Sequence, residues 1–266
     1  MPLKWLVQNK YKLMAFIIVA YVLADILQHK GLVRVLIPKN FPGYMIDTGF
    51  PGNKNALINT NKEWVKGVNS KARMEAVNEN SAGLECDIYF DPGKNEFDVH
   101  HDKDNSSGLN LDDLLQVYQR RGLRASFWLD FKNLNDSNSK QSVTEILRLR
   151  NKFGLIDKLL VESYRVDLLK QFSDSGLYTS YYTPMFNPYL CSEDSLKHWT
   201  DYLKAVVDHS SVNALSGYYF QYPFLHHCFP NYPILIWSPN DKFSIVNWWY
   251  KKRIASNEAV FISLYP

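Results

Sequence analysis

Acidic residues and lysines recur at the ends of several predicted strands. Glu85 and Asp87 flank Cys86 in an apolar run, and strand side chains alternate in direction, so both carboxylates face one side. Asp130 and Lys132 share one side of a later run in the same way. Burying carboxylates is costly without a cation, and hard oxygen ligands suit Mg²⁺ or Ca²⁺. We therefore expect Glu85, Asp87 and Asp130 to bind one divalent cation, with Lys132 balancing charge or holding an anionic substrate.

A histidine follows these acidic strands at the end of a predicted hairpin. His101 is the candidate acid–base group because histidine titrates near neutral pH, whereas His100 is expected to pack or to be solvated if it points away. Glu162 is either a fourth carboxylate of the site or a partner of Arg165. A lone E-x-D pair is more often a surface ion pair. That interpretation weakens here because E-x-D, H-H-D and D-x-K fall at successive predicted strand ends.

Other candidate groups point to structural roles. His226 and His227 precede Cys228, but they lack a partner set with zinc-ligand spacing. No G-x-S-x-G sequence occurs, so serine hydrolysis lacks support. Several aromatic residues are expected to form core and pocket wall rather than a cofactor box: Tyr181, Tyr182, Tyr218, Tyr219, Phe220 and Tyr222.

Short apolar runs alternate with helix-like stretches along most of the chain. The predicted strands span 65–69, 83–90, 97–101, 125–131, 158–164, 178–183, 216–221, 234–238 and 259–264. The predicted helices span 71–80, 111–121, 142–153, 166–173, 192–206 and 241–256. Turn residues at 91–95 make 84–101 a hairpin, and setting aside its second arm leaves eight βα-type strands. We expect an α/β fold, a (β/α)₈ TIM barrel with a hairpin insertion after strand two.

The main alternative is an open doubly wound sheet. Neither G-x-G-x-x-G nor G-x-x-x-x-G-K-[ST] occurs, which weakens the nucleotide-binding versions of that fold. The composition is that of a globular protein, with 46% hydrophobic, 21% charged and 15% aromatic residues. A net charge of +3 without a basic block gives no case for nucleic-acid binding. Three scattered cysteines predict neither a disulfide framework nor a zinc cluster.

The N-terminal segment differs from the rest of the chain. Lysines precede an apolar run over 13–27 that only Asp25 interrupts, which predicts an N-terminal hydrophobic helix. Residues 1–37 are favoured as an uncleaved membrane anchor over a cleaved signal segment and over a soluble helix. Residues 38–61, rich in proline and glycine, are expected to form a linker, and 62–266 the barrel. The barrel would then be extracytoplasmic, with a secreted or periplasmic form as the alternative.

The ordered motifs resemble the glycerophosphodiester phosphodiesterase-like, or phospholipase-C-like phosphodiesterase, barrel superfamily. The matching pieces are GLECDIYF, a hairpin closing on HHD, WLDFKN, LLVESY, ILIWSPN and the terminal AVFISLYP. The pieces VNSKARMEAV, FDVHHD, WLDFKN and VESY are more similar still to the menorin-like branch. The resemblance runs from about Trp64 to Pro266.

The resemblance implies a (β/α)₈ barrel that uses one divalent cation and two histidines to cleave phosphodiesters. Glu85, Asp87 and Asp130 match metal ligands, Lys132 a phosphate-contacting lysine, and His101 the second catalytic histidine. Trp237 matches a tryptophan that lines the pocket, and we expect Asn69 and Glu162 to contact substrate beside it.

One position departs from the superfamily pattern. Lys66 stands where the first catalytic histidine is expected. A lysine can neutralise a phosphate, but it ordinarily stays protonated at neutral pH and makes a poor base. The loss of one acid–base partner typically costs about 10²–10⁴-fold in rate.

We expect a Mg²⁺- or Ca²⁺-dependent phosphodiester hydrolase or lyase. Its substrate would be a glycerophosphodiester or lysophospholipid-like molecule, with the membrane contacted through the N-terminal helix. The alternative is a weak or inactive barrel that binds a lipid, glycan or protein. A glycosidase that pairs Glu162 with Asp130 or Glu85 is a third and weaker possibility.

Overall fold

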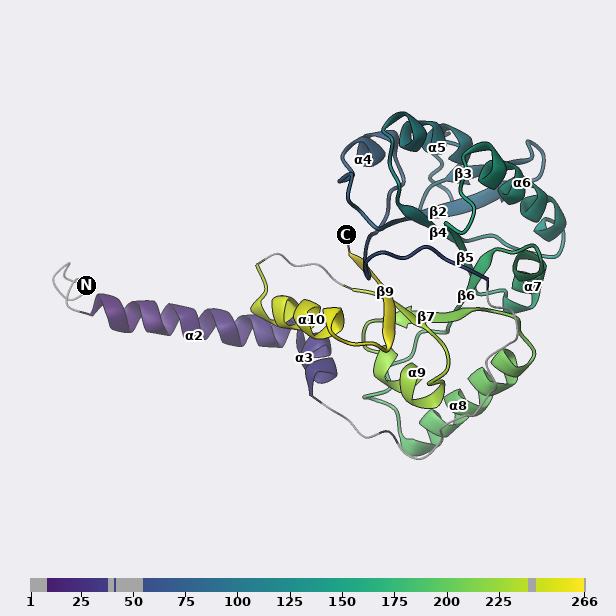
Figure 1. The fold of residues 1–266 in the computed structure, drawn as a ribbon. Helices are drawn as coiled ribbons and strands as arrows, with labels where there is room; N and C mark the ends of the chain where they lie inside the picture. The colour runs from purple at the N-terminus through teal and green to yellow at the C-terminus, as the bar shows by residue number, and fades with distance from the viewer. Residues whose placement is uncertain (1–8, 38–40, 42–54, 239–242, 266) are drawn as a thin grey trace. The chain divides into compact units, whose positions relative to one another are not determined.

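The computed structural model describes residues 9–37, 41, 55–238 and 243–265. They form two compact units, which Figure 1 colours by residue number. One unit takes in the described parts of Met1–Asn40 and Pro239–Asn257, and the other those of Phe41–Ser238 and Glu258–Pro266.

The larger unit is a closed barrel, and its described residues contain eight parallel strands (Figure 1). Around the barrel the order is β1 (Glu63–Val65), β9 (Val260–Tyr265), β8 (Ile234–Trp237), β7 (Ala214–Tyr218), β6 (Tyr178–Tyr182), β5 (Leu159–Ser163), β4 (Ser126–Phe131) and β2 (Gly83–Asp91). Pairing of Val65 on β1 with Leu84 on β2 closes the ring. The structure therefore confirms the predicted TIM barrel and excludes the open doubly wound sheet.

The predicted hairpin is also present. The second half of β2 pairs antiparallel with β3 (Glu96–Val99), with Tyr89 opposite Asp98. The first half of β2 pairs in parallel with β1 and β4. One long strand thus serves both the barrel and the insertion.

Helices connect the strands, mostly as the sequence predicts. They are α4 (Lys71–Glu75), α5 (Leu111–Arg120), α6 (Ser139–Lys152), α7 (Val166–Asp174), α8 (Glu193–Asp208) and α9 (Tyr222–Cys228) in the larger unit. Helix α9 is absent from the sequence prediction because its aromatic run, with proline in its first turn, shows no clear helical period.

Two predicted strands lie elsewhere than expected. β1 ends at Val65 rather than at residue 69, because Gly67 adopts a left-handed φ of 68° that ends the extended backbone. The prediction of a strand over 216–221 is wrong at both ends, since β7 spans Ala214–Tyr218. The backbone N–H of Tyr218 donates to Oε1 of Gln221 (2.9 Å), and that of Gln221 to the Tyr218 carbonyl oxygen (2.8 Å), which makes a turn.

Large aromatic side chains fill the barrel interior. Trp64 and Trp128 are fully buried in a cluster with Leu160, Leu235 and other apolar residues. A Cβ added at Gly83 would lie 1.9 Å from the Trp64 ring, so this position admits no side chain while the ring stays in place. The close approach packs β2 directly against the tryptophan.

Part of the predicted linker joins the barrel. Residues 38–40 and 42–54 lie outside the described residues. Residues 55–61 contact the segments at the starts of β4, β5 and β6: the Asn55 side chain donates to the Leu177 carbonyl oxygen (2.7 Å), and Ser126 Oγ to that of Ile58 (2.6 Å). The Ile58 N–H donates to the carbonyl oxygen of Asp157 (2.7 Å). These residues therefore cover the end of the barrel where its strands begin.

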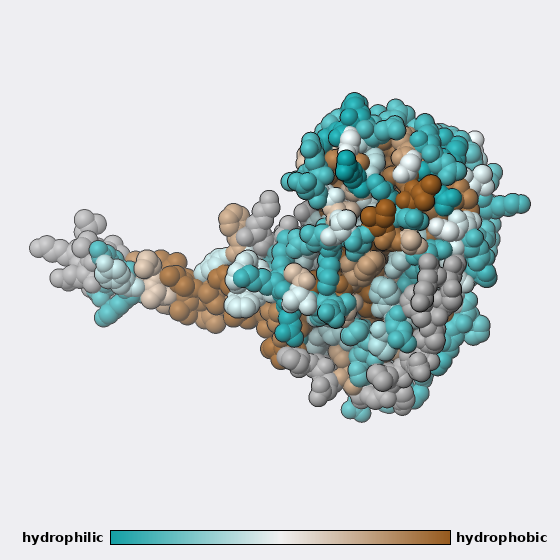
Figure 2. All heavy atoms as spheres, viewed as in Figure 1, coloured by the Kyte–Doolittle hydropathy of each residue, from teal (hydrophilic) through white to brown (hydrophobic). Residues whose placement is uncertain are grey.

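The smaller unit contains three described helices, α2 (Lys10–Gln28), α3 (Lys30–Leu36) and α10 (Ile245–Ala255). The predicted N-terminal hydrophobic helix is thus present. Figure 2 shows hydrophobic side chains along α2. The helix has 19 residues and contains an 18-residue window with a mean hydropathy of 1.7, which suffices by composition and length to cross a bilayer.

Candidate functional site

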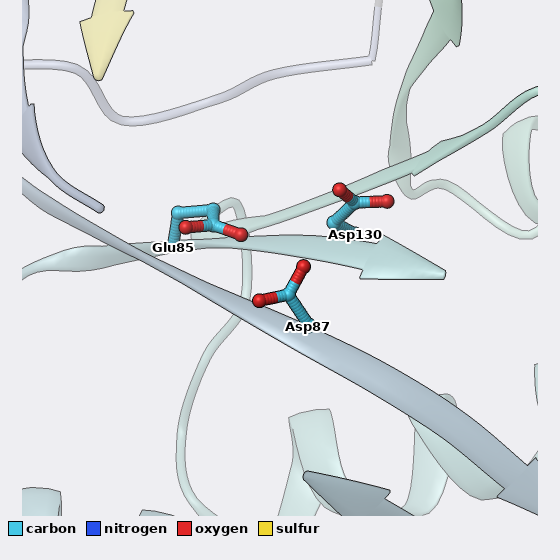
Figure 3. A group of neighbouring side chains, drawn as sticks. All are labelled: Glu85, Asp87 and Asp130. Atoms are coloured by element: carbon cyan, nitrogen blue, oxygen red, sulfur yellow. The ribbon is translucent and has the colours of Figure 1, made fainter. Parts of the chain in front are cut away.

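Three buried carboxylates meet where β2 lies beside β4. The pairing of these strands sets Asp87 opposite Asp130, and alternation along β2 turns Glu85 to the same side. One carboxylate oxygen from each residue lies within 4.8 Å of those from the other two, and Figure 3 shows the three side chains directed into a common space. The structure thus brings together the three residues predicted as metal ligands.

Burial raises the pKa of two of these carboxylates, Glu85 and Asp130. Removal from water, followed by the charges of Asp87 and Asp130, raises the pKa of Glu85 to about 8. Burial also raises the pKa of Asp130, against the opposing effect of Lys132. A nearby positive charge would stabilise the ionised form of these carboxylates, which burial and mutual repulsion disfavour.

Neighbouring polar groups hold the carboxylates in place. The Gly67 N–H donates to Glu85 Oε2 (2.5 Å), which the left-handed turn at this glycine makes possible. The Asn69 side chain donates to Asp87 Oδ2 (2.5 Å), and its Oδ1 accepts from the Asp87 N–H (2.9 Å). Asn69, predicted to contact substrate, therefore orients a carboxylate here. Gly67 was not predicted as part of the site, although a glycine inside a predicted strand can indicate a turn of this kind.

Lys132 supplies the positive charge of the cluster. Its Nζ lies 2.8 Å from Asp87 Oδ1 and also forms an ion pair with Asp130. Burial alone would lower the lysine pKa, but the two carboxylates raise it well above its usual range. Lys132 is therefore a fixed cation rather than a proton carrier.

The donor set fits a divalent cation. When all three carboxylates are ionised, they and the Lys132 ammonium carry two net negative charges, which a divalent cation would balance. Carboxylate oxygens are the ligands that Mg²⁺ and Ca²⁺ prefer. Glu85, Asp87 and Asp130 would hold the ion.

A cavity of about 100 Å³ opens above the carboxylates at the end of the barrel where the strands terminate. Besides the cluster, the cavity is lined by Lys66, His101, Tyr182, Tyr218 and Trp237. The Trp237 ring lies 4.6 Å from that of Tyr182 and 5.5 Å from that of Tyr218, both edge-on. Trp237, Tyr182 and Tyr218 thus line the cavity, and the contact of Trp237 with substrate stays a prediction.

The two adjacent histidines have different environments. His101 is exposed and its Nδ1 lies 2.9 Å from Asp102 Oδ1, which leaves Nε2 available to a ligand. His100 is buried, stacks on Tyr89 at 4.2 Å between ring centroids, and bonds through Nδ1 to the Asp102 carbonyl oxygen (2.7 Å). His100 therefore packs, and His101 is the histidine that faces the cavity.

Glu162 lies deeper than the cavity. It is fully buried beside Asp130 in the register of β4 and β5, and it is not among the residues that line the cavity. Burial and the charge of Asp130 raise its pKa well above the usual range. Arg165 pairs instead with Asp136 and Asp167, so the ion pair between Glu162 and Arg165 is not formed.

Two other parts of the larger unit, a second hollow and a pair of histidines, are weaker candidates for a functional site. A hollow of about 390 Å³ lies between the β2–β3 hairpin, α5 and α6, but its Arg148 forms ion pairs with both Asp112 and Glu145. Among the described residues, His226 and His227 belong to no group of three potential metal ligands. Their predicted structural role is consistent with the packing of the His227 ring near Phe41 (6.3 Å).

Comparison with solved structures shows that the fold of this chain is similar to that of known phosphodiesterases. No protein-family model and no curated protein sequence matches the chain. A glycerophosphodiester phosphodiesterase from Parabacteroides distasonis superposes with a TM-score of 0.54 at 12% identity, covering 77% of this chain and 93% of that one. A phosphodiesterase from Oleispira antarctica, solved with the product sn-glycerol-3-phosphate, gives 0.52 at 12% identity, covering 77% and 92%. The chain thus shares the expected barrel fold with these phosphodiesterases, while the likeness to the menorin-like branch stays a prediction.

Proposed function

We propose that the cavity binds a phosphodiester and that the protein hydrolyses it, with a divalent cation at the carboxylate cluster. The observation that supports this most directly is the meeting of Glu85, Asp87 and Asp130 with two lysines and a histidine around one cavity. The substrate class we propose is a glycerophosphodiester or a lysophospholipid-like molecule, by analogy with the phosphodiesterases that share the fold.

Each residue has a role that follows from its position. A bound divalent cation would polarise the phosphate oxygens and stabilise the charge that develops on them. Lys132 and Lys66 line the cavity and would neutralise and orient the phosphate. A water would attack phosphorus as the bond to the leaving oxygen breaks. Doubly protonated His101, with Nδ1 turned to Asp102, would donate its Nε2 proton to that oxygen and then take up the proton that the water loses. Trp237 would pack against the leaving group.

A second candidate function is a binding-only barrel. Two observations favour it: Lys66 stands where the superfamily carries a histidine, and Lys132 already neutralises part of the carboxylate charge. Such a protein would retain its phosphodiester ligand when divalent cations are removed.

Hydrolysis assays on the full chain in nonionic detergent test both functions. A panel of glycerophosphodiesters and lysophospholipids is assayed with Mg²⁺, with Ca²⁺ and with EDTA. Asp87→Ala removes a cluster carboxylate, and Asp113→Ala, which removes a partly exposed carboxylate on α5 away from the cavity, is the matched control. Cation-dependent turnover that only Asp87→Ala abolishes supports the enzyme.

The Lys66→His variant separates an active site from a degenerate one. Restoring the expected histidine should raise turnover by about 10²–10⁴-fold if an acid–base partner is what the chain lacks. A silent wild type with an active Lys66→His variant supports the binding-only barrel. Silence in both, with no stabilisation by either cation, contradicts the proposed site.

We further propose that α2 anchors the chain in a membrane and that the barrel is extracytoplasmic. Support comes from the length of α2 and from the exposure of its apolar side chains, such as Phe16 (70%) and Leu27 (74%). Resistance of the full chain to alkaline carbonate extraction, together with protease accessibility on one side of sealed vesicles, tests both parts.

A further inference from the structure

Helix α10 carries apolar side chains on a buried face and on an exposed face. One face, with Val246, Tyr250 and Ile254, is buried. The other carries Trp248 and Trp249, which are 50% and 56% exposed. Two large apolar side chains exposed next to each other on a helix whose other face is buried form a surface suited to a further contact.

Basic residues extend this exposed face. Lys252 Nζ lies 4.0 Å from the Trp248 ring centroid, and Arg253 is exposed one residue further on. The two indole rings meet edge-on at 5.1 Å. Exposed tryptophans beside lysine and arginine are typical of surfaces that lie at the headgroup level of a bilayer.

Hydrogen bonds join α10 to the apolar helix α2 within the same compact unit. Asp25, buried in the last turns of α2, accepts at Oδ2 from the Val246 N–H at the start of α10 (3.0 Å). His29 pairs with Asp25 (2.9 Å), and its Nδ1 lies 3.3 Å from Ser244 Oγ. An acidic residue in an apolar helix is costly in lipid, and here its charge is met by the first turn of α10 and by the histidine.

This connection sets the depth of α10 relative to α2. Nineteen residues of helix rise about 28 Å, close to the roughly 30 Å of a hydrocarbon core. Asp25 lies three residues before the end of α2 at Gln28, so the residues bonded to it lie at one boundary of the core. Figure 1 shows α10 beside that end of α2.

We propose that α10 is a second membrane contact. Trp248 and Trp249 enter the boundary between headgroups and acyl chains, and Lys252 and Arg253 bind anionic headgroups of the leaflet at the end of α2. The tryptophan face supplies the apolar contact, and the basic end supplies the charge complementarity. The inference extends membrane attachment from α2 to a helix between β8 and β9, and it does not depend on the proposed phosphodiester chemistry.

Depth-dependent quenching of tryptophan fluorescence tests the proposal. The full chain is reconstituted into vesicles of phosphatidylcholine and phosphatidylglycerol that contain lipids brominated near the headgroup end of the acyl chain. The signal of α10 is the difference between the wild type and the Trp248→Phe/Trp249→Phe variant, because the other five tryptophans are common to both. We expect quenching in the difference signal, strongest for bromines near the headgroups and weaker for bromines at the chain end. No quenching in the difference signal overturns the proposal.

Substitution of Asp25 tests whether this residue holds α10 at the membrane. Asp25→Asn keeps an acceptor oxygen for the Val246 N–H and should retain the quenching. Asp25→Leu removes the acceptor while making α2 more apolar, so the chain stays in the vesicles but the α10 signal should fall. Equal quenching in both variants overturns the role of Asp25 in holding α10.

The charge requirement is tested with paired substitutions. Lys252→Gln/Arg253→Gln should lower the quenching to the level seen in pure phosphatidylcholine vesicles. The control Lys197→Gln/Lys204→Gln removes the same charge from exposed positions on α8 and should leave the quenching unchanged. Equal quenching of the wild type in vesicles with and without phosphatidylglycerol overturns the assignment of these residues to anionic headgroups.

Discussion

Replacing Glu85 with glutamine should remove a pH dependence from the stability of the metal-free protein. The pKa of Glu85 is raised from 4.5 to about 8, first by burial and then by Asp87 and Asp130. The neutral form is therefore favoured in the folded state. The stability that Glu85 confers is fully present below pH 4.5 and is lost as pH rises through about 8.

The size of this effect follows from the pKa difference. At about 1.4 kcal/mol per pH unit, a pKa that moves from 4.5 to about 8 corresponds to a loss of about 5 kcal/mol across that window. Glu85→Gln cannot ionise, so the variant should match the wild type near pH 4.5 and exceed it above pH 8. The substitution also removes a negative charge that repels Asp130, which further stabilises the variant at high pH.

Urea unfolding of the full chain in nonionic detergent with EDTA, followed by circular dichroism from pH 4.5 to 9, measures this difference. Glu79→Gln, on the exposed segment after α4, is the control and should follow the wild type throughout. Excess Mg²⁺ at pH 8 should stabilise the wild type more than Glu85→Gln, because the cation favours the ionised carboxylate. Parallel stability profiles for the wild type and Glu85→Gln would refute the reasoning.

Two further substitutions test the packing and the charge of the site. Gly83→Ala places a Cβ 1.9 Å from the Trp64 ring and should destabilise the fold by about 1–3 kcal/mol, whereas Gly93→Ala, in an exposed turn, should have a small effect in the same urea titration. Lys132→Met leaves two buried carboxylates without their cation and should cost about 3–5 kcal/mol at neutral pH in EDTA, with partial recovery in saturating Mg²⁺. Lys152→Met, which breaks an exposed pair, should cost about 1 kcal/mol or less; equal losses in the two lysine variants would contradict a buried charge cluster.

The barrel was predictable from the sequence because its determinants are local. Alternation of apolar runs with helical stretches, and turn residues between β2 and β3, specify the eight strands and the hairpin without knowledge of their neighbours. Helix α9 was not predicted because its short aromatic run shows no hydrophobic period that distinguishes a helix from a strand. The end of β1 was not predicted correctly because it depends on the left-handed turn at Gly67. The N–H of that glycine donates to Glu85, a residue on another strand.

The sequence by itself determined which residue types could do chemistry and which of them share a strand face. Glu85 and Asp87 had to face one way, because strand side chains alternate with a period of two. Only the tertiary structure decided how these side chains combine. The register of β2 against β4 sets Asp87 opposite Asp130. His100 is buried by stacking on Tyr89, whereas His101 faces the cavity. The first turn of α10 donates a hydrogen bond to the carboxylate of Asp25. The physical reason is that strand alternation is fixed by neighbouring bonds, whereas register, burial and charge pairing depend on residues distant in the chain.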